Sequence, residues 1–284
     1  MKEEMSARHS TSAADYAPHS IHQGIDRMAR VGFVTKGVVY IVIGVMAVRA
    51  AFNVGGDTEG TRGAILEIGS QPFGQVLLAL TAIGLLGYAL WRFVAAGVDP
   101  YGDESDAKGI AKRVGFVVSG IIYLGLAIWA ARIVLGGSSG GSQGGSSEAW
   151  TAKLMAQPFG VWLVGLVGAV IVAIGLYHFY KAYKAKFMRR YDSGVMNQRQ
   201  RTWARRLGRF GLSARGVTFV IIGGFLIQAA KQTDPSETGG LPEALQTLEQ
   251  QPYGPWVLGI VAAGFVAYGA YCMTRARFST FSTR

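Results

Sequence analysis

Long apolar stretches separated by polar connections dominate this chain. Each of the six contains at least the roughly 20 residues that an α-helix needs to cross the ~30 Å hydrocarbon core of a bilayer. A helical bundle folded in water does not need six stretches of this length. The pattern predicts an all-α polytopic membrane protein with six transmembrane helices. They are expected in residues 31–52, 72–96, 114–135, 158–181, 210–230 and 252–274.

Two short signatures recur three times in the same order. The first opens an apolar stretch as Arg-x-Gly, four further residues, then Gly-x-x-Tyr or Gly-x-x-Phe, in residues 30–40, 113–123 and 209–219. The second opens the next stretch as Gln-Pro-aromatic-Gly, in residues 71–74, 157–160 and 251–254. Repetition at a fixed order indicates a tandem array of one supersecondary unit. The six helices are therefore predicted to be three copies of a two-helix repeat.

The repeat sets the expected organisation of the chain. Two crossings return the chain to its starting side, so the three units share one orientation and are expected around a pseudo-threefold axis along the membrane normal. A closed ring and a row of units both remain open. The predicted segments are a disordered cytoplasmic tail (1–26), repeat 1 (27–100), repeat 2 (108–187), a basic cytoplasmic linker (188–202) and repeat 3 (203–278).

Charge predicts the orientation in the membrane. Lys and Arg are concentrated in the amino-terminal tail, in 97–113, in 182–209 and in the carboxyl tail, whereas the opposite loops contain only Arg62, Lys153 and Lys231. The positive-inside rule places the basic side, and with it both termini, in the cytoplasm. The same asymmetry explains a net charge of +11, so no nucleic-acid partner is expected.

Each loop on the less basic side is expected to contain a short amphipathic helix that lies on the outer membrane face. The candidate segments are 64–68, 150–155 and 241–248. The second of these loops also contains a Gly/Ser-rich flexible linker in 136–147. On the basic side, Ile21, Ile25 and Met28 have helical spacing and suggest a short interfacial helix that leads into the first span.

The two signatures resemble those of DUF1206, a bacterial membrane domain of unknown function that occurs in tandem copies. The resemblance covers residues 27–284, with Phe219 and Tyr253 as small departures in the third copy. It implies a multi-pass protein of the bacterial inner membrane. It implies no activity, cofactor or binding site.

Small residues form stripes on the predicted helices. Gly37, Gly120 and Gly216 occupy one repeat position, with Gly44, Ala127 and Gly223 seven residues later. Such faces allow membrane helices to approach closely, and we interpret them as packing surfaces. The prolines Pro72, Pro158 and Pro252 are expected in the first turn of a helix, where a missing N–H costs nothing.

Charged and aromatic residues near the spans are the candidates for binding. Lys36, Ser119 and Arg215 share one repeat position, which suggests an incomplete cationic ring for an anion or lipid headgroup. Such long side chains could also snorkel to the membrane surface, which is the simpler interpretation. The aromatic stripe that includes Tyr88 and Trp91 is interpreted as an interfacial belt, with ligand stacking as the alternative. The full candidate set for an anion site or pathway is Lys36, Ser119, Arg215, Arg92, Tyr40 and Tyr123.

No catalytic, cofactor or metal-binding motif is present in the sequence. Cys272 is the single cysteine, and no Asp or Glu lies in the middle of a span. We therefore predict a non-catalytic membrane component that binds lipid, with anionic lipid as one option, or a protein partner, or that self-associates. The alternative is a small channel or transporter for an anion or an uncharged solute. An enzyme is the least favoured function.

Overall fold

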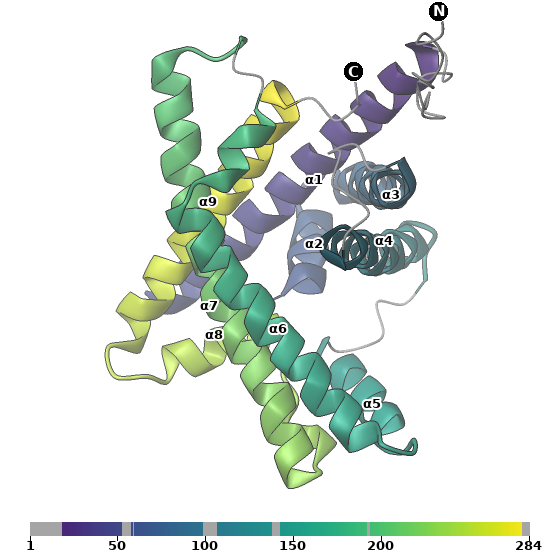
Figure 1. The fold of residues 1–284 in the computed structure, drawn as a ribbon, viewed down its shortest axis with the longest axis vertical. Helices are drawn as coiled ribbons and strands as arrows, with labels where there is room; N and C mark the ends of the chain where they lie inside the picture. Colours follow the sequence, from purple (N-terminus) through teal and green to yellow (C-terminus); the bar gives the residue numbers. More distant parts are fainter. Residues whose placement is uncertain are drawn as a thin grey trace, which may run out of the picture.

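The computed structural model describes residues 19–52, 58, 60–98, 107–137, 143–191 and 194–279, and in these residues it is almost entirely helical, without a strand (Figure 1). Six of its helices are long and apolar enough to cross a membrane, as predicted. They are α1 (His19–Ala51), α3 (Gly74–Val98), α4 (Ala107–Val134), α6 (Gly160–Tyr183), α7 (Gln198–Gln232) and α9 (Gly254–Phe278).

Three short helices occupy the loops that join the two long helices of each repeat, as the amphipathic segments predicted. They are α2 (Thr61–Ser70), α5 (Gln143–Met155) and α8 (Leu241–Glu249). Two of them pack inward, because Ile65 of α2 and Leu245 of α8 are fully buried.

The repeats close into a ring through their most extensive helix contacts. The second helix of one repeat packs against the first helix of the next, α3 against α4 and α6 against α7, and α9 returns to pack against α1. Figure 1 shows the α3–α4 pair end-on while the other two pairs lie across the view, so the three pairs run in different directions. Each repeat therefore contacts both of the others, although α4 and α6 of repeat 2 are not among the extensively packed helix pairs of the described residues.

Small residues form the contacts within these pairs. A Cβ atom on Gly37 of α1 would lie 2.8 Å from the carbonyl oxygen of Gly269 in α9, and one on Gly216 of α7 would lie 3.0 Å from that of Gly175 in α6. A Cβ on Gly120 of α4 would lie 2.8 Å from the Phe93 ring of α3. Close backbone approach of this kind drives association of membrane helices. The small faces thus pack between repeats.

The Gln-Pro-aromatic-Gly signature forms a tight turn between a short helix and a long one. Phe159 has φ 61° and ψ 12°, and the N–H of Gly160 donates to the carbonyl of Gln157 at 2.8 Å. These values describe a type II turn with proline at its second position. The long helices begin at the glycine, so the expectation that the prolines lie in the first helical turn was wrong: Pro72, Pro158 and Pro252 lie two residues earlier.

The glycine of this turn is sterically required. A Cβ atom on Gly74 would lie 1.7 Å from the carbonyl oxygen of Gly69, and one on Gly254 would lie 1.6 Å from that of Glu249. The preceding aromatic residues are more than four-fifths exposed, for example Phe73 at 84%. Such rings are suited to the membrane–water interface.

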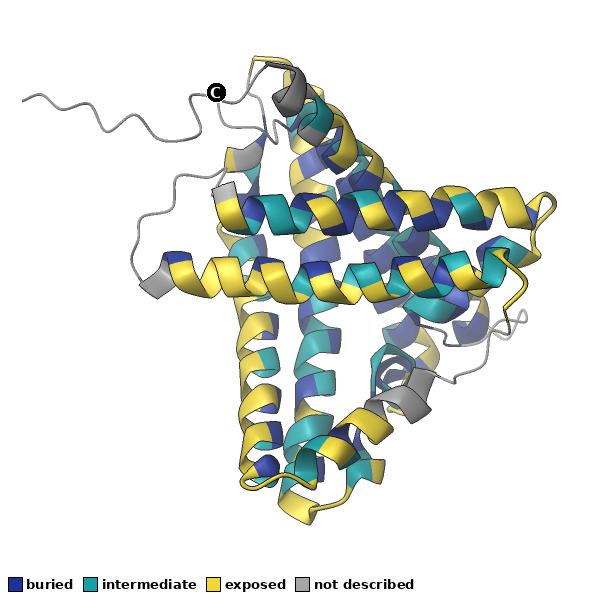
Figure 2. Ribbon diagram, turned by 90° about the vertical axis from the view of Figure 1, so that its right-hand side faces the viewer, coloured by how far each residue is buried: buried dark blue, intermediate teal, exposed yellow. Residues whose placement is uncertain are grey.

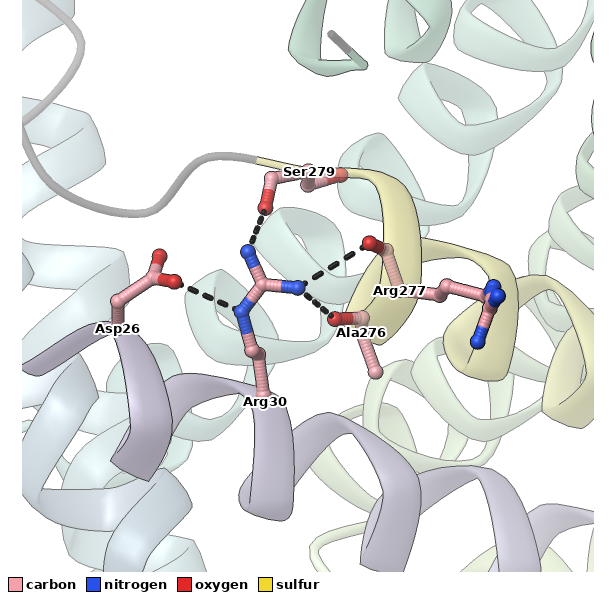
Figure 3. A network of polar contacts seen from close by, with 5 residues as sticks. All are labelled: Asp26, Arg30, Ala276, Arg277 and Ser279. Carbon is pink, nitrogen blue, oxygen red and sulfur yellow. Dashed lines mark hydrogen bonds and ion pairs between the residues drawn. The ribbon is translucent and has the colours of Figure 1, made fainter. Parts of the chain in front are cut away.

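The arginine of the first signature caps the end of a neighbouring helix. Arg30 donates through Nη1 to the carbonyls of Ala276 and Arg277 at 2.9 and 3.1 Å, and through Nη2 to that of Ser279 at 3.3 Å (Figure 3). Its Nε pairs with Asp26 at 2.7 Å. Arg209, at the same repeat position, donates to the carbonyl of Tyr183 at the end of α6 at 3.1 Å. A cation there satisfies free carbonyls and opposes the negative end of the helix dipole.

The basic connection between repeats 2 and 3 is partly ordered. A 3-10 helix covers Lys186–Arg190, and Asn197 caps α7 by accepting a hydrogen bond from the N–H of Gln200 at 2.9 Å. The Tyr191 hydroxyl lies 2.8 Å from Oγ1 of Thr274, and burial raises the pKa of this phenol. The segment predicted as a linker therefore already contains the first turns of α7.

At the amino terminus, α1 begins at His19, so residues 19–26 of the predicted tail are helical, in agreement with the spacing of Ile21, Ile25 and Met28. Residues 1–18 lie outside the described part of the chain.

Candidate functional site

The ammonium group of Lys36 is buried among aromatic side chains from α1, α3, α4 and α9. The residue is 4% exposed, and its Nζ donates to the Tyr88 hydroxyl at 3.1 Å. Four tyrosine rings face this nitrogen. The distances from Nζ to the ring centroids are 4.9 Å for Tyr88, 5.2 Å for Tyr123, 5.6 Å for Tyr268 and 5.9 Å for Tyr40. Lys36 is thus held in an aromatic cage and does not snorkel to the surface.

Arg215 lies against the same cage. Its Nη1 donates to the Tyr268 hydroxyl at 2.7 Å, and its guanidinium carbon lies 4.7 Å from the centroid of that ring. The same carbon is 5.4 Å from the Tyr40 ring and 5.1 Å from the Phe219 ring. Lys36 and Arg215 therefore share two tyrosines, one from α1 and one from α9.

A third cation lies beside the cage. The guanidinium carbon of Arg92 is 5.1 Å from both the Tyr88 and the Phe116 rings and 5.4 Å from the Trp91 ring. Its Nε is buried without a hydrogen-bond partner in the described part of the chain. We refer to Lys36, Arg92, Arg215, Tyr40, Tyr88, Tyr123 and Tyr268 as the cation–tyrosine cluster.

The six long helices offer these cations no carboxylate. Asp26, at the start of α1, is their only acidic residue, and it pairs with Arg30. A single cation–π contact contributes ~0.5–2 kcal/mol, whereas a charge at the centre of a spanning helix costs roughly 2.5–3.5 kcal/mol on insertion scales. The aromatic rings can therefore offset the burial of one cation.

The presence of several cations adds an uncompensated repulsion. Lys36 and Arg215 both face the Tyr268 ring, 5.6 and 4.7 Å from its centroid. They are thus no more than about 10 Å apart, and they repel by about 2 kcal/mol at an effective dielectric constant of about 20. An anion between them would attract both cations, and this attraction would outweigh their mutual repulsion.

The cluster lies between two apolar cores. One core, towards the short helices, includes Ile43, Ile65, Leu245 and Phe265. The other, towards the basic side, includes Phe33, Trp91, Phe187 and Tyr271. Tyr40 and Tyr123 pack against both cores. The cations are therefore inside the protein, at a level between its two packed halves.

Repeat 2 differs from the other two repeats beside the cluster. In repeat 1, α1 and α3 pack closely, and a Cβ atom on Gly32 would lie 2.6 Å from Cα of Tyr88. In repeat 3, a Cβ on Gly211 would lie 2.5 Å from Cα of Tyr268. The corresponding residue of α4, Gly115, has no neighbour within 4 Å of such an atom. In the described residues α1 packs against α3 and α7 against α9, whereas α4 and α6 are not among the extensively packed helix pairs, so the α4–α6 hairpin is open.

The open hairpin exposes residues whose counterparts are buried. We define the open face as Gly115 and Val118 of α4 with Val170, Ile174 and Tyr177 of α6. Val118 and Val170 are each 50% exposed, Ile174 is 40% and Tyr177 is 53%. Ile174 corresponds to Tyr88 in repeat 1 and Tyr268 in repeat 3, and both tyrosines are buried. Tyr177 corresponds to Trp91 and Tyr271, which are also buried. Figure 2 shows exposed residues along the long helices.

The structure brings five of the six sequence candidates into the cluster: Lys36, Arg92, Arg215, Tyr40 and Tyr123. The sixth, Ser119, lies one helical turn before Tyr123 and is half-buried. The interpretation of Tyr88 and Trp91 as an interfacial belt was wrong, because both are inside the protein, at 0% and 2% exposure. Tyr88 and Tyr268 recur at one repeat position, and this recurrence could have linked them to Lys36 and Arg215.

One further charged residue was not a candidate. Arg275 of α9 is 6% exposed, and its guanidinium carbon lies 4.3 Å from the Phe33 ring. Repeats 1 and 2 place Ala95 and Lys181 at this position, so the repeat pattern gave no signal. In the described residues no group of His, Cys, Asp and Glu could hold a metal ion.

Comparison with known proteins also divides the chain into three repeats. The family model "Domain of Unknown Function (DUF1206)" matches residues 31–99, 114–185 and 210–279. An "Uncharacterized protein YxxB" of Bacillus subtilis (strain 168) is 36% identical over 251 residues, which cover 88% of this chain and 90% of that protein. No solved structure matches significantly. The chain therefore belongs to the DUF1206 family and carries three copies of its domain.

Proposed function

We propose that this protein is a non-catalytic membrane component that binds the anionic headgroup of a lipid at the cation–tyrosine cluster. The observation that supports this proposal is the convergence of Lys36, Arg92 and Arg215 in the interior of spans that offer them no carboxylate. Lysine and arginine N–H groups suit phosphate oxygens, and the tyrosine hydroxyls can donate further hydrogen bonds to them.

The charge distribution supports an orientation for this component. With the basic side in the cytoplasm, both termini are cytoplasmic, and the protein belongs in the bacterial inner membrane. Lys36 lies about 9 Å along α1 from Arg30 at 1.5 Å per residue. The cluster is therefore expected in the cytoplasmic half of the bilayer, within reach of lipids of that leaflet.

The double variant Lys36→Gln with Arg215→Gln tests the proposal. Retention of phosphatidylglycerol, measured by native mass spectrometry against phosphatidylcholine, is expected to fall at least about tenfold, which corresponds to ~1.4 kcal/mol. Arg49→Gln with Arg132→Gln is the matched control, because it removes two charges from the opposite ends of first helices. If the double variant retains phosphatidylglycerol over phosphatidylcholine as strongly as the unmodified protein does, the cluster does not bind the headgroup. It would then serve only as an aromatic cage that holds Lys36 in the fold.

A conservative variant separates binding from folding. Lys36→Arg with Arg215→Lys keeps both charges and is expected to retain phosphatidylglycerol. Inorganic phosphate provides a second probe. If it raises the melting temperature of the delipidated protein and phosphatidylglycerol does not, the ligand is a free anion.

A small channel or transporter for an anion is the second candidate. The mutual contacts of the three repeats and the buried cations Lys36, Arg92 and Arg215 favour it. The apolar core around Ile43, Ile65 and Leu245, on the side of the short helices, argues against a continuous polar path. Anion flux into liposomes that contain the protein would decide between these two functions.

A further inference from the structure

We infer that the open α4–α6 hairpin of repeat 2 is the lateral site through which an anionic lipid reaches the cluster, with its acyl chain lying on the open face. This inference rests on the proposed function and adds a route and a binding surface to it.

The open face is apolar within the span. Val118, Val170 and Ile174 are between 40% and 50% exposed, and they come from two helices of one repeat. Both helices are long and apolar enough to span a membrane, so we expect hydrocarbon at this surface. An acyl chain is the apolar group that a bilayer supplies at such a surface.

The inner end of the open face is the cation–tyrosine cluster. On the α4 side, Tyr123 lies 5.2 Å from Nζ of Lys36, and its ring is 4.6 Å from that of Tyr88. On the α6 side, His178 stacks on Phe219 with 5.4 Å between the ring centroids, and Phe219 contacts Arg215. Thus α4 contributes the Tyr123 ring beside Lys36, and α6 contributes His178, which stacks on the Phe219 ring beside Arg215.

Charge complementarity identifies the ligand. The open face accepts an apolar chain, and the cluster at its end carries positive charges without carboxylates. A molecule that fits both parts is an amphiphile with a negative headgroup. Zwitterionic lipid fits the apolar part equally well but gains less from the cations. A second copy of this chain would cover the apolar face and would bring no anion to Lys36 and Arg215.

Sequence explains why the hairpin stays open. A Cβ atom on Gly84 of α3 would lie 1.8 Å from Oγ1 of Thr35, and one on Gly264 of α9 would lie 2.4 Å from Cβ of Ala214. Repeat 2 carries Val170 at this position and Val118 opposite it. Two branched side chains therefore occupy the point at which the other two hairpins meet, so the opening is built into the sequence of repeat 2.

Photo-crosslinking in nanodiscs tests the inference on the unmodified protein. A phosphatidylglycerol with a diazirine in its acyl chain is compared with the matching phosphatidylcholine, and adducts are mapped by peptide mass spectrometry. We expect adducts in 114–122 of α4 and 166–177 of α6 to be enriched about tenfold for phosphatidylglycerol. Adducts spread evenly over all lipid-facing helices for both lipids would overturn the inference.

Two double variants separate this inference from the proposed function. Val118→Trp with Ile174→Trp fills the open face and is expected to lower phosphatidylglycerol retention at least fivefold. Leu80→Trp with Ile83→Trp adds the same bulk to exposed positions of α3 and is expected to leave retention unchanged. If filling the open face does not affect retention while Lys36→Gln with Arg215→Gln abolishes it, the cluster binds lipid by another route. If neither variant affects retention, the proposed function fails as well.

Discussion

Repeats 1 and 3 form closed hairpins, whereas repeat 2 does not, although all three begin and continue with the same signatures. In the closed hairpins, Gly84 and Gly264 allow a close approach, and Tyr88 and Tyr268 fill the interface from the second helix. In repeat 2 the same two positions are Val170 and Ile174. These differences, together with Val118 in α4, distinguish the open hairpin from the two packed ones, while the contacts between repeats persist.

The comparison also shows that contacts between repeats, and not contacts within each repeat, hold repeat 2 in the ring. Repeat 2 has little internal packing, yet α4 and α6 are held by α3 and α7. Contacts between repeats are therefore sufficient to place a repeat in the ring. A protein built this way can leave one hairpin open without losing its architecture.

The largest expected effect on stability comes from placing the valine of the open hairpin, Val170, at the corresponding glycine of a closed hairpin, Gly264. Gly264→Val would drive branched carbons into Ala214, and overpacking typically costs about 1–3 kcal/mol or more. We expect a fall of roughly 3 kcal/mol in stability, measured by thermal unfolding in detergent. Val170→Leu, at the same position of repeat 2, should stay within about 0.5 kcal/mol. Equal losses in the two variants would contradict the difference between the hairpins.

A single methyl group gives a finer comparison. Gly211→Ala places its Cβ 2.5 Å from Cα of Tyr268, whereas the Cβ of Gly115→Ala meets nothing within 4 Å. The first change is expected to cost about 1–3 kcal/mol. The second is expected to be neutral, or stabilising by up to ~1 kcal/mol through helix propensity. Unfolding curves of both proteins, recorded side by side, check the difference in sign.

Ring closure can be weakened at one helix cap. Arg30 donates to three carbonyls at the end of α9, whereas Arg209 has one such bond at the end of α6. Because Arg30 is partly exposed, we expect Arg30→Gln to cost only about 1–2 kcal/mol. Arg209→Gln should cost less than about 1 kcal/mol. Proteolysis near the carboxyl end should also become faster in the Arg30 variant, and an unchanged cleavage rate would argue against a closing role for this cap.

The smallest effect on stability is expected when repeat 2 receives the residues of its neighbours. Val170→Gly with Ile174→Tyr removes the obstruction and supplies the missing tyrosine, with a net change below about 1 kcal/mol. The hairpin should close. A cysteine introduced at Val118 would then react more slowly with maleimide than it does without the other two changes, and Cys272 is fully buried in either case. Equal labelling rates would show that other residues hold the hairpin open.

The sequence was sufficient to predict the membrane class, the six helices and the three repeats, because these depend on helix length and on recurring residues. The short helices in the loops between the two long helices of each repeat were also predicted. The prolines were misplaced because the aromatic residue after each of them adopts a left-handed conformation, which φ of 61° at Phe159 and Tyr253 shows. Such a conformation is uncommon for non-glycine residues, and nothing in the local sequence indicates it.

Ring closure and the cluster could be predicted only in part. Lys36 and Arg215 share a repeat position, which suggested a common site, but the direction of their side chains depends on which helices meet. Snorkelling and burial are both compatible with a lysine within two turns of the start of the predicted span at residue 31. The packing of α9 on α1, which brings Tyr268 to Lys36, is a contact between the two ends of the chain that no local pattern encodes.

The central claim is that the open repeat admits an anionic lipid to a buried cation–tyrosine cluster. A structure in nanodiscs that contain phosphatidylglycerol, at a resolution that shows bound lipid, tests it most directly. We expect headgroup density between Lys36 and Arg215 and an acyl chain between α4 and α6, near Val118 and Ile174. A closed α4–α6 hairpin, with Lys36 and Arg215 surrounded by tyrosines alone, would contradict the claim.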